Sequence, residues 1–322
     1  MQKQHYRERT DQMTFYDNTT SRRTFLAGSL GAAAGACAMH ALGTRASHAA
    51  EAQPARPNLR FGLATYQWGM DWDIPTLIAN CQKAKVFSVE LRTSSKYAHG
   101  VELELTAGQR SDVKKRFADS PVAVVSIACS ERMDWPEPEK LKAAVEASKA
   151  YLKLSHDVGS PTVRIFPNQF HPNVPREKTI EQIAKAAGEV GAAAADLGQE
   201  VSLEAHGPAG ELATMRAIMD QVTQKSVRVR LNCDNRDTLG KGFEENFNLV
   251  KDRLSRIIHL HGLKDAKFPY PQLVSLLVKA NWDGWALMEN SDKVPDRAAA
   301  LTEQREIWDA LVEKALFGQA GK

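Results

Sequence analysis

The sequence predicts an α/β protein built as a closed (β/α)8 barrel, the TIM-barrel architecture. From residue 61 onward, short apolar segments alternate with amphipathic segments. Such alternation implies parallel strands joined by right-handed helical crossovers. It occurs eight times in about 260 residues, a count and length typical of this barrel. An open, doubly wound sheet is the main alternative, but no Gly-x-Gly-x-x-Gly motif follows the first strand.

The first four strand–helix units are marked by β-branched runs and by residues that begin or end helices. Strands are expected over 61–66, 86–91, 122–128 and 162–166. Helices are expected over 74–85, 106–119, 136–159 and 177–197. Thr106 is a favourable N-cap, Pro138 suits a first helical turn, and Gly159 and Gly198 suit helix ends.

The second four units continue the same pattern. Strands are expected over 200–203, 227–231, 256–260 and 285–288. Helices are expected over 209–224, 244–253, 271–280 and 296–315. Because no change of composition marks a second domain, we expect residues 53–322 to form one barrel.

Residues 1–52 resemble a cleavable bacterial signal peptide of the twin-arginine type. Arg22 and Arg23 precede Thr-Phe-Leu, and a stretch rich in Ala and Gly, without charged residues, runs to about Gly43. A basic start, an apolar middle and small residues near Ala49 are typical of such signals. A transmembrane anchor is the alternative, but Ala and Gly bury little apolar surface. We therefore expect a periplasmic or secreted protein that is free of the membrane after cleavage.

The composition describes an ordinary globular protein with a neutral body. Hydrophobic residues make up 43% and charged residues 25%. The chain has 42 Lys and Arg against 39 Asp and Glu, and residues 1–50 hold six basic and three acidic residues, which leaves 36 of each sign in 51–322. Nucleic-acid binding normally requires a basic surface, so the charge gives no support for that function.

Polar residues stand where the predicted strands end, which is where such barrels place their active sites. Four of them end consecutive strands, the fifth to the eighth: Glu204, Asp234, His261 and Glu289. Ionised side chains among apolar residues are costly to bury unless they are paired or bind a metal. Three carboxylates and one imidazole suit Mn²⁺, Mg²⁺ or Co²⁺, with Zn²⁺ also allowed. A structural polar network is the alternative.

Further polar residues near these strand ends are candidates for binding substrate oxygens. Residues two apart on a strand share a face, so Glu90 with Arg92, and His259 with His261, can reach the barrel mouth together. The choice of His261 as the metal ligand is therefore a judgement between two inward-facing histidines. The substrate-binding candidates are Glu90, Arg92, His99, Arg164, Asn168, His206 and His259. Local salt bridges are the alternative for Arg92 and Arg164.

These motifs resemble those of the sugar phosphate isomerase/epimerase family, which has a xylose-isomerase-like barrel. The resemblance covers about residues 60–315 and rests on the segments 89–92 (VELR), 99–102 (HGVE), 163–168 (VRIFPN), 204–207 (EAHG), 232–234 (NCD), 259–261 (HLH) and 284–289 (GWALME). It implies that Glu204, Asp234, His261 and Glu289 hold a divalent metal, and that the two glutamates also move protons. Two departures stand out: Asp237 replaces the family's His or Asn, and 261–265 is one residue longer than the usual His-x-Lys-Asp.

The resemblance implies a sugar isomerase or epimerase that removes a proton α to a carbonyl and forms an enediolate. Loss of a β-substituent from the same intermediate would instead make the protein a lyase or hydratase of keto-sugars or keto-glycosides. A non-catalytic sugar-binding protein and a metal-dependent DNA-repair nuclease are further alternatives, and the neutral body argues against the nuclease. The expected partner is a small-molecule sugar or keto-sugar, and self-association into a homo-oligomer is left open.

Overall fold

A computed structural model of the protein describes residues 57–94 and 96–318. The predicted signal peptide, residues 1–52, lies outside them. Within the described residues, no helix has the length and apolar character needed to cross a membrane.

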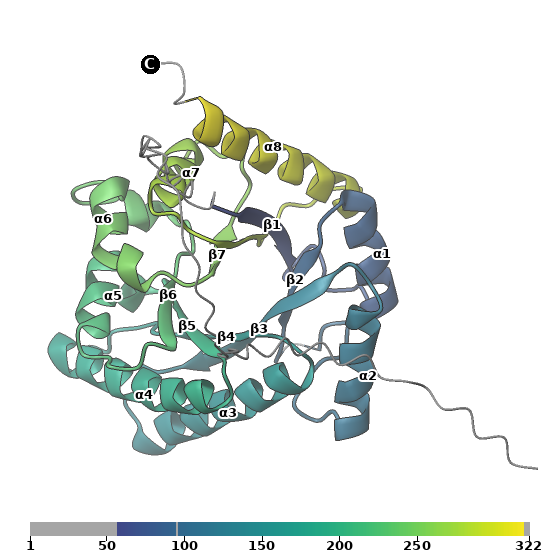
Figure 1. The fold of residues 1–322 in the computed structure, drawn as a ribbon. Helices are drawn as coiled ribbons and strands as arrows, with labels where there is room; N and C mark the ends of the chain where they lie inside the picture. The colour runs from purple at the N-terminus through teal and green to yellow at the C-terminus, as the bar shows by residue number, and fades with distance from the viewer. Residues whose placement is uncertain (1–56, 95, 319–322) are drawn as a thin grey trace, which may run out of the picture. The chain divides into compact units, whose positions relative to one another are not determined.

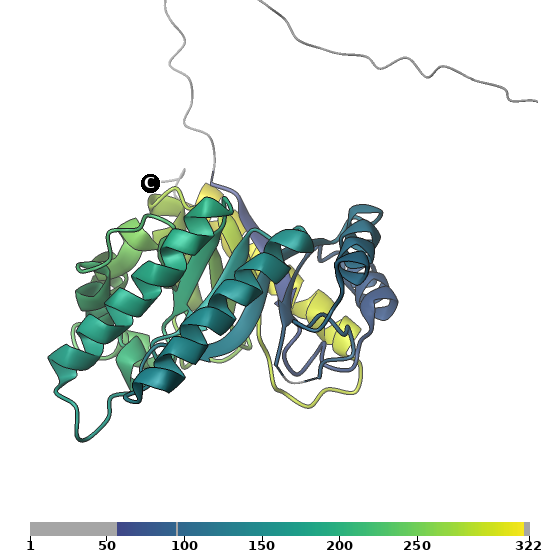
Figure 2. The same ribbon diagram turned by 90° about the horizontal axis from the view of Figure 1, so that it is seen from below.

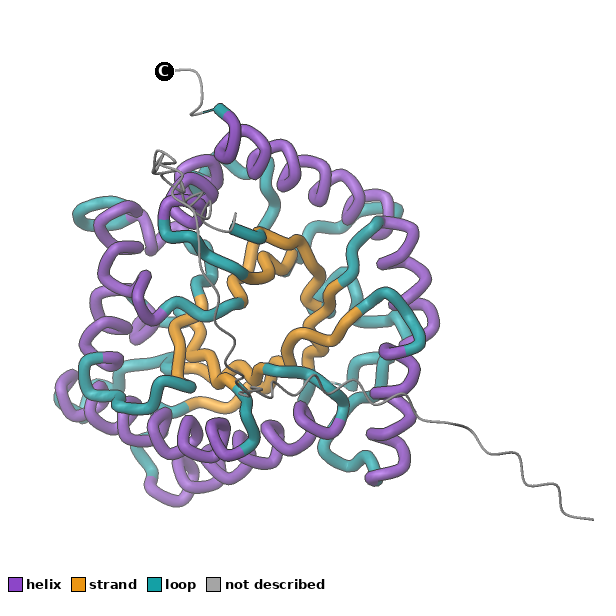
Figure 3. Tube along the Cα trace, in the orientation of Figure 1, coloured by secondary structure: helices purple, strands orange, loops and turns teal. Residues whose placement is uncertain are grey.

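Parallel strands form the wall of a barrel. Within the described residues they are β1 (Leu59–Ala64), β2 (Ser88–Arg92), β3 (Ala123–Arg132), β4 (Thr162–Phe166), β5 (Glu200–Glu204), β6 (Val227–Arg230), β7 (Ile257–Leu260) and β8 (Gly284–Met288). They pair in the order β6-β5-β4-β3-β2-β1-β8-β7, so the first strand lies beside the last (Figures 1 and 3). Leu63 of β1 stands opposite Met288 of β8. This pairing confirms the predicted (β/α)8 barrel and excludes the open sheet.

A short seam closes the barrel between β6 and β7. Val229 of β6 forms an isolated parallel bridge with Leu254, which precedes β7. The backbone N–H of Ser255 donates to the Val229 carbonyl (2.7 Å), and that of His259 donates to the Leu231 carbonyl (2.9 Å). The other seven boundaries between neighbouring described strands carry ladders.

The α-helices surround the strands (Figure 1) and run at a slant along the outside of the barrel (Figure 2). In the described part of the chain they are α1 (Ile74–Ala84), α2 (Ala107–Ala118), α3 (Pro138–Asp157), α4 (Arg176–Asp196), α5 (Leu212–Met219), α6 (Phe243–Val250), α7 (Tyr270–Lys279) and α8 (Arg297–Phe317). α1, α2 and α8 begin at Asp73, Thr106 and Asp296, whose side chains accept backbone N–H groups three residues on. The prediction that Thr106 caps a helix is confirmed.

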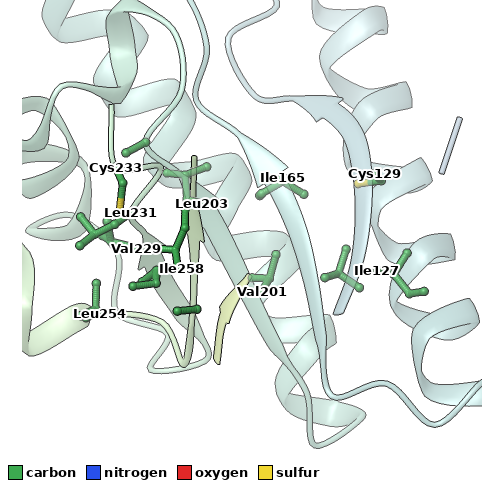
Figure 4. Packing of buried hydrophobic residues seen from close by; sticks show 14 of the residues in the cluster. Ile127, Cys129, Ile165, Val201, Leu203, Val229, Leu231, Cys233, Leu254 and Ile258 are labelled. Atoms are coloured by element: carbon green, nitrogen blue, oxygen red, sulfur yellow. The ribbon is translucent and has the colours of Figure 1, made fainter. Parts of the chain in front are cut away.

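Apolar side chains at alternate strand positions form the main core beneath the helices. Val201 and Leu203 of β5 are fully buried in one cluster with Ile165 of β4 and Val229 of β6 (Figure 4). Successive residues of a strand point to opposite faces, so the intervening positions face the barrel interior. On β5 one of these interior residues is Glu204, which is also buried. Burial of the apolar face therefore directs the strand-end polar residues inward.

The structure departs from the sequence expectation over 209–224. The predicted single helix is instead a 3-10 turn, Pro208–Gly210, followed by the shorter α5. Glu211 between them is extended, with φ −55° and ψ 135°. A Cβ on Gly210 would lie 2.5 Å from the backbone of Ala205, so the turn packs closely on the end of β5 and the helix starts later.

Candidate active site

A cavity of about 270 Å³ opens at the C-terminal ends of the strands. It is lined by Tyr66, Arg92, Arg164, Phe166, Glu204, His206, Asn232, His261, Glu289 and Ser291. These residues end or follow seven of the described strands, so positions far apart in the sequence converge at one end of the barrel. Six of the predicted site residues are among them.

A larger cavity of about 520 Å³ lies on the outside of the barrel, lined mainly by residues of α3 and α4. Its lining combines apolar side chains such as Leu141 and Val145 with solvent-facing Lys and Glu. The strand-end cavity is the smaller one, but it gathers the buried ionisable groups, and this is the end at which (β/α)8 barrels carry their chemistry.

Arg164 and Glu204 form a fully buried ion pair at this cavity. Arg164 Nη1 donates to Glu204 Oε2 (2.9 Å), and the side chains are each 1% exposed. Arg164 Nε donates to the Cys129 carbonyl (3.2 Å), and the guanidinium lies 4.1 Å from the centre of the Phe166 ring. The guanidinium is therefore held in place by a carboxylate, a backbone carbonyl and an aromatic ring.

A second buried pair lies deeper in the barrel, formed by Glu90 of β2 and Arg230 of β6. Arg230 Nη1 donates to Glu90, and its Nη2 donates to Ser126 Oγ (2.9 Å). His259 of β7 lies beside the pair, with Nε2 2.7 Å from Glu90 Oε1. The side chains of Glu90, Arg230 and His259 are at most 1% exposed. Arg92 lines the cavity, and Glu90 precedes it on the same strand and the same face. The layer formed by Glu90, Arg230 and His259 therefore lies beneath the cavity.

His259 joins the two layers. Its Nδ1 lies 3.2 Å from Glu204 Oε2 and 3.3 Å from Glu289 Oε2. Neither contact has the geometry of a hydrogen bond, so Nδ1 has no hydrogen-bond partner in the described residues. Ligand atoms of Glu204, His259 and Glu289 all lie within 4.8 Å of one another. Nε2 lies 2.7 Å from Glu90 Oε1 and 3.2 Å from Arg230 Nη1, and the closer contact, to a carboxylate that can only accept, favours a proton on Nε2. Nδ1 is then left to accept a cation, an arrangement typical of metal-binding histidines. The three side chains therefore fit a divalent metal ion.

The electrostatics of this group favour ionised carboxylates. Burial raises the pKa of Glu204, but Arg164 and His259 outweigh it and hold the pKa well below the usual value. Burial also raises the pKa of Glu289, but His259 outweighs burial and the pKa is lowered from its usual value. For His259, burial lowers the pKa, while Glu289, Glu90 and Glu204 raise it well above normal. Glu204 and Glu289 thus attract positive charge to Nδ1, which a proton or a metal ion can supply.

The other two predicted metal ligands are placed differently. The Asp234 carboxylate accepts from Arg236 Nη2 (2.7 Å) and from the Arg236 backbone N–H (3.0 Å). His261 lines the cavity, and its Nδ1 lies 3.0 Å from the backbone oxygen of Glu289. The structure therefore brings Glu204 and Glu289 together with His259, which the sequence analysis placed among the substrate-binding residues. Asp234 instead forms an ion pair with Arg236 of the turn that follows it.

Several predicted substrate-binding residues lie away from the cavity. Glu90 is sealed beneath it, as described above. His99 is 5% exposed, accepts the backbone N–H of Val101 at Nδ1 (3.1 Å) and lies 3.0 Å from the Arg92 carbonyl through Nε2. Burial lowers the pKa of His99 to about 4, so the ring is neutral and supports the turn after β2.

Asn168 and His206 form a polar link at the cavity rim. The amide nitrogen of Asn168 faces His206 Nδ1 (3.2 Å), and its oxygen accepts from Arg132 Nε (2.8 Å). Asn168 has a positive φ of 65°, which an asparagine tolerates better than most residues. His206 lines the cavity, whereas Asn168 holds it in place from behind.

Arg230, a fully buried charge beneath the cavity, was not predicted from the sequence. A signal was present, because Val-Arg-Val-Arg places Arg230 on the same face as Asn232 and two residues before it. Tyr66 and Phe166 were also missed; they contact the guanidinium groups of Arg92 and Arg164.

Residues 78–311 match the model of the xylose isomerase-like TIM barrel. The chain belongs to this family. No curated protein sequence matches it.

Several solved structures share the fold at low sequence identity. An L-ribulose 3-epimerase has a TM-score of 0.68 and 13% identity, with 81% of this chain and 97% of that chain covered. The 3-keto-D-glucoside 4-epimerase YcjR from E. coli has a TM-score of 0.64 and 13% identity, with 79% and 100% covered. IOLI protein with a binding zinc atom has a TM-score of 0.64 and 12% identity, with 81% and 98% covered.

Within this xylose isomerase-like barrel, Asp237 has a local structural role. It is 1% exposed, and its Oδ2 accepts the backbone N–H of Asp234 (3.2 Å). Together the two aspartates cap the 3-10 turn Asn235–Thr238. Burial raises the pKa of Asp237 to about 7. At this position the chain therefore has a residue that shapes the turn carrying Asp234.

Proposed function

We propose that the protein is a divalent-metal-dependent isomerase or epimerase of a free sugar or keto-sugar. One observation carries the proposal: Glu204 and Glu289 face one cavity, and each has an oxygen within 3.3 Å of the same buried nitrogen of His259. Membership of the family, and the sugar epimerases among proteins of similar fold, support the same chemistry.

Glu204, His259 and Glu289 would hold the metal, with His261 on the same cavity wall. A divalent ion bound there supplies a Lewis acid for the carbonyl and the neighbouring hydroxyl of the sugar. Glu90 fixes the orientation of His259 through the 2.7 Å contact to Nε2, so Nδ1 stays directed at the two carboxylates.

The two glutamates are suited to moving the proton. Their lowered pKa values keep them ionised at neutral pH, the state in which a carboxylate accepts a proton. Glu204 ends β5 and Glu289 directly follows β8, and β6 and β7 lie between these strands in the closed barrel, so the two glutamates approach a bound sugar from different sides. Glu204 or Glu289 removes the proton α to the carbonyl, and the other returns it on the opposite face or on the neighbouring carbon.

The test is solvent isotope exchange. The full-length protein with Mn²⁺ is incubated in D₂O with aldoses, ketoses and 3-keto-glycosides, and deuterium beside the carbonyl is followed by NMR. We expect exchange with at least one sugar, and Glu204→Gln and Glu289→Gln should each slow it by about 10²–10⁴-fold. Glu303→Gln is the matched control, since Glu303 is 53% exposed and pairs with Lys264.

Three outcomes would contradict the proposal. Absence of exchange with every sugar, in the presence of Mn²⁺, Mg²⁺, Co²⁺ or Zn²⁺, would reject the isomerase or epimerase and favour the alternative of a non-catalytic sugar-binding protein. Exchange accompanied by loss of a substituent would make the protein a lyase. Exchange at full rate in both glutamine variants would place the base elsewhere.

We also propose that the protein acts outside the cytoplasm. The support is the Arg22-Arg23 pair, followed by an uncharged stretch rich in Ala and Gly. Such a location favours an unphosphorylated sugar, because phosphosugars are handled mainly inside the cell.

A further inference from the structure

With the His259 ring neutral, the state in which Nδ1 can bind a metal, the charges around the cavity balance before any metal ion is counted. In the described residues three arginines meet three glutamates: Arg230 pairs with Glu90, Arg164 with Glu204, and Arg92 with Glu289. Each glutamate thus already has a guanidinium partner. A divalent cation held by Glu204 and Glu289 adds two positive charges to a neutral group, and buried excess charge is costly unless a counter-charge accompanies it. A bound substrate can supply that counter-charge.

Two of these guanidinium groups have a buried donor without a partner in the described residues, Arg230 Nε and Arg164 Nη2, and of these two arginines Arg164 lines the cavity. Arg164 uses Nη1 for Glu204 and Nε for the Cys129 carbonyl, but its buried Nη2 has no hydrogen-bond partner within residues 57–94 and 96–318. Arg164 lines the cavity, and its side chain is 1% exposed. Since buried polar groups are normally hydrogen-bonded, this donor points to an acceptor on the ligand.

Arg92 adds a second positive charge on the same cavity wall. Its Nη1 donates to Glu289 Oε1 (2.9 Å), and its guanidinium lies 4.8 Å from the centre of the Tyr66 ring. The side chain is 21% exposed, so it can turn toward a ligand when Glu289 takes up a cation. A guanidinium is the side chain best shaped to bind a carboxylate, through parallel N–H groups.

The cavity wall also contains a hydrogen-bond acceptor without a partner in the described residues, on Asn232. Asn232 is 6% exposed and lines the cavity, and its Oδ1 accepts no hydrogen bond from the described part of the chain. An acceptor of this kind suits a sugar hydroxyl. The volume of about 270 Å³ is below the roughly 300–1,000 Å³ of pockets that hold drug-sized ligands, so it suits a single monosaccharide.

We propose that the substrate of this pocket is a sugar acid, a monosaccharide whose carboxylate binds Arg164 and Arg92 and whose hydroxyl group donates to Asn232. The proposal rests on the function proposed above and names the substrate class of the same site. Arg164 and Arg92 are then substrate-binding residues that select charge, while Glu204 and Glu289 remain the proton carriers.

The test compares acids with neutral sugars that differ only at one carbon. Isothermal titration of the full-length protein with Mn²⁺ uses D-glucuronate against D-glucose, 5-keto-D-gluconate against L-sorbose, and the other hexuronates against their hexoses. We expect at least one acid to bind about tenfold or more tightly than its neutral partner. The proposal is wrong if no acid binds at about 10 mM, or if every acid and its partner bind within about threefold.

Two variants separate recognition of the carboxylate from support of Glu204. Arg164→Lys keeps the positive charge but lacks Nη2, and Arg92→Gln removes the more exposed charge. Each should reduce the acid-to-neutral affinity ratio by about tenfold, with both affinities measured on protein whose Mn²⁺ content has been determined. Arg256→Gln is the control, because Arg256 is 56% exposed and pairs with Asp283. An unchanged ratio in both variants would overturn the proposal, since structural support alone would shift both ligands equally.

The two proposals fail separately. Isotope exchange on neutral sugars alone would retain the isomerase or epimerase and reject the sugar acid. Tight, Arg164-dependent binding of an acid without exchange would retain the charge selectivity and reject the reaction.

Discussion

Replacing Glu90 with Gln tests whether this residue contacts substrate or supports the site from beneath. The carboxylate is 1% exposed and contacts both Arg230 and His259. The substitution keeps the shape but leaves Arg230 without its buried counter-charge. Removing one member of a buried ion pair costs about 3–5 kcal/mol of unfolding free energy. For a barrel of this size that corresponds to a fall in Tm of roughly 6–20 °C.

Urea unfolding followed by circular dichroism at pH 7 measures this cost, in chelator so that bound metal does not add to stability. Glu303→Gln, at an exposed pair, should change the free energy of unfolding by less than about 1 kcal/mol. In a double-mutant cycle, Glu90→Gln with Arg230→Met should cost at least about 1 kcal/mol less than the sum of the single changes. A stable Glu90→Gln protein with a raised KM would refute the reasoning and restore the substrate-binding role expected from the sequence.

Three further predictions concern the metal, the pH dependence and export. A chelator should abolish isotope exchange, and added Mn²⁺ should restore it; full exchange in metal-free protein would contradict the metal dependence. His99 has a folded-state pKa of about 4, below its unfolded value of about 6.5, so the unfolded chain binds the extra proton and stability should fall by up to about 3 kcal/mol as pH drops from 6.5 to 4. His99→Gln should lose that part of the pH dependence in urea titrations, and an unchanged slope would refute it. Replacement of Arg22 and Arg23 by Lys should leave the uncleaved precursor in the cytoplasm of a twin-arginine-competent host, whereas normal cleavage seen on immunoblots would reject the targeting signal.

The barrel could be predicted from the sequence because its physical cause is local. Each strand needs an apolar face for the helices, and this requirement produces the repeated pattern from Leu59 to Met288. The inward orientation of Glu204 and Glu289 follows from the same alternation. Helix ends without a capping side chain were less predictable, as in the region of α5, where close packing of Gly210 on Ala205 decides where the helix begins.

Which charges pair with which could not be predicted, because pairing depends on depth and on side-chain reach across the barrel. His259 and His261 face inward alike in the sequence, yet only His259 lies between the two glutamates, one layer deeper. Asp234 has the strand-end position of a ligand, but Arg236 two residues later reaches its carboxylate. Arg230 and Glu90 are 140 residues apart, and only the closed barrel brings them into contact.

The seam between β6 and β7 makes the barrel wall uneven in strength. Separating these strands breaks the bridge at Val229 and the backbone hydrogen bonds donated by Ser255 and His259, whereas every other boundary between described strands must lose a ladder. We therefore expect local opening of the native barrel to occur first between β6 and β7, with faster amide hydrogen exchange at Ser255 than in β4 or β5. Because Arg230 and His259 flank the seam, we expect the same fluctuation to admit water to the buried charges through the barrel wall, and not only through the cavity at the strand ends.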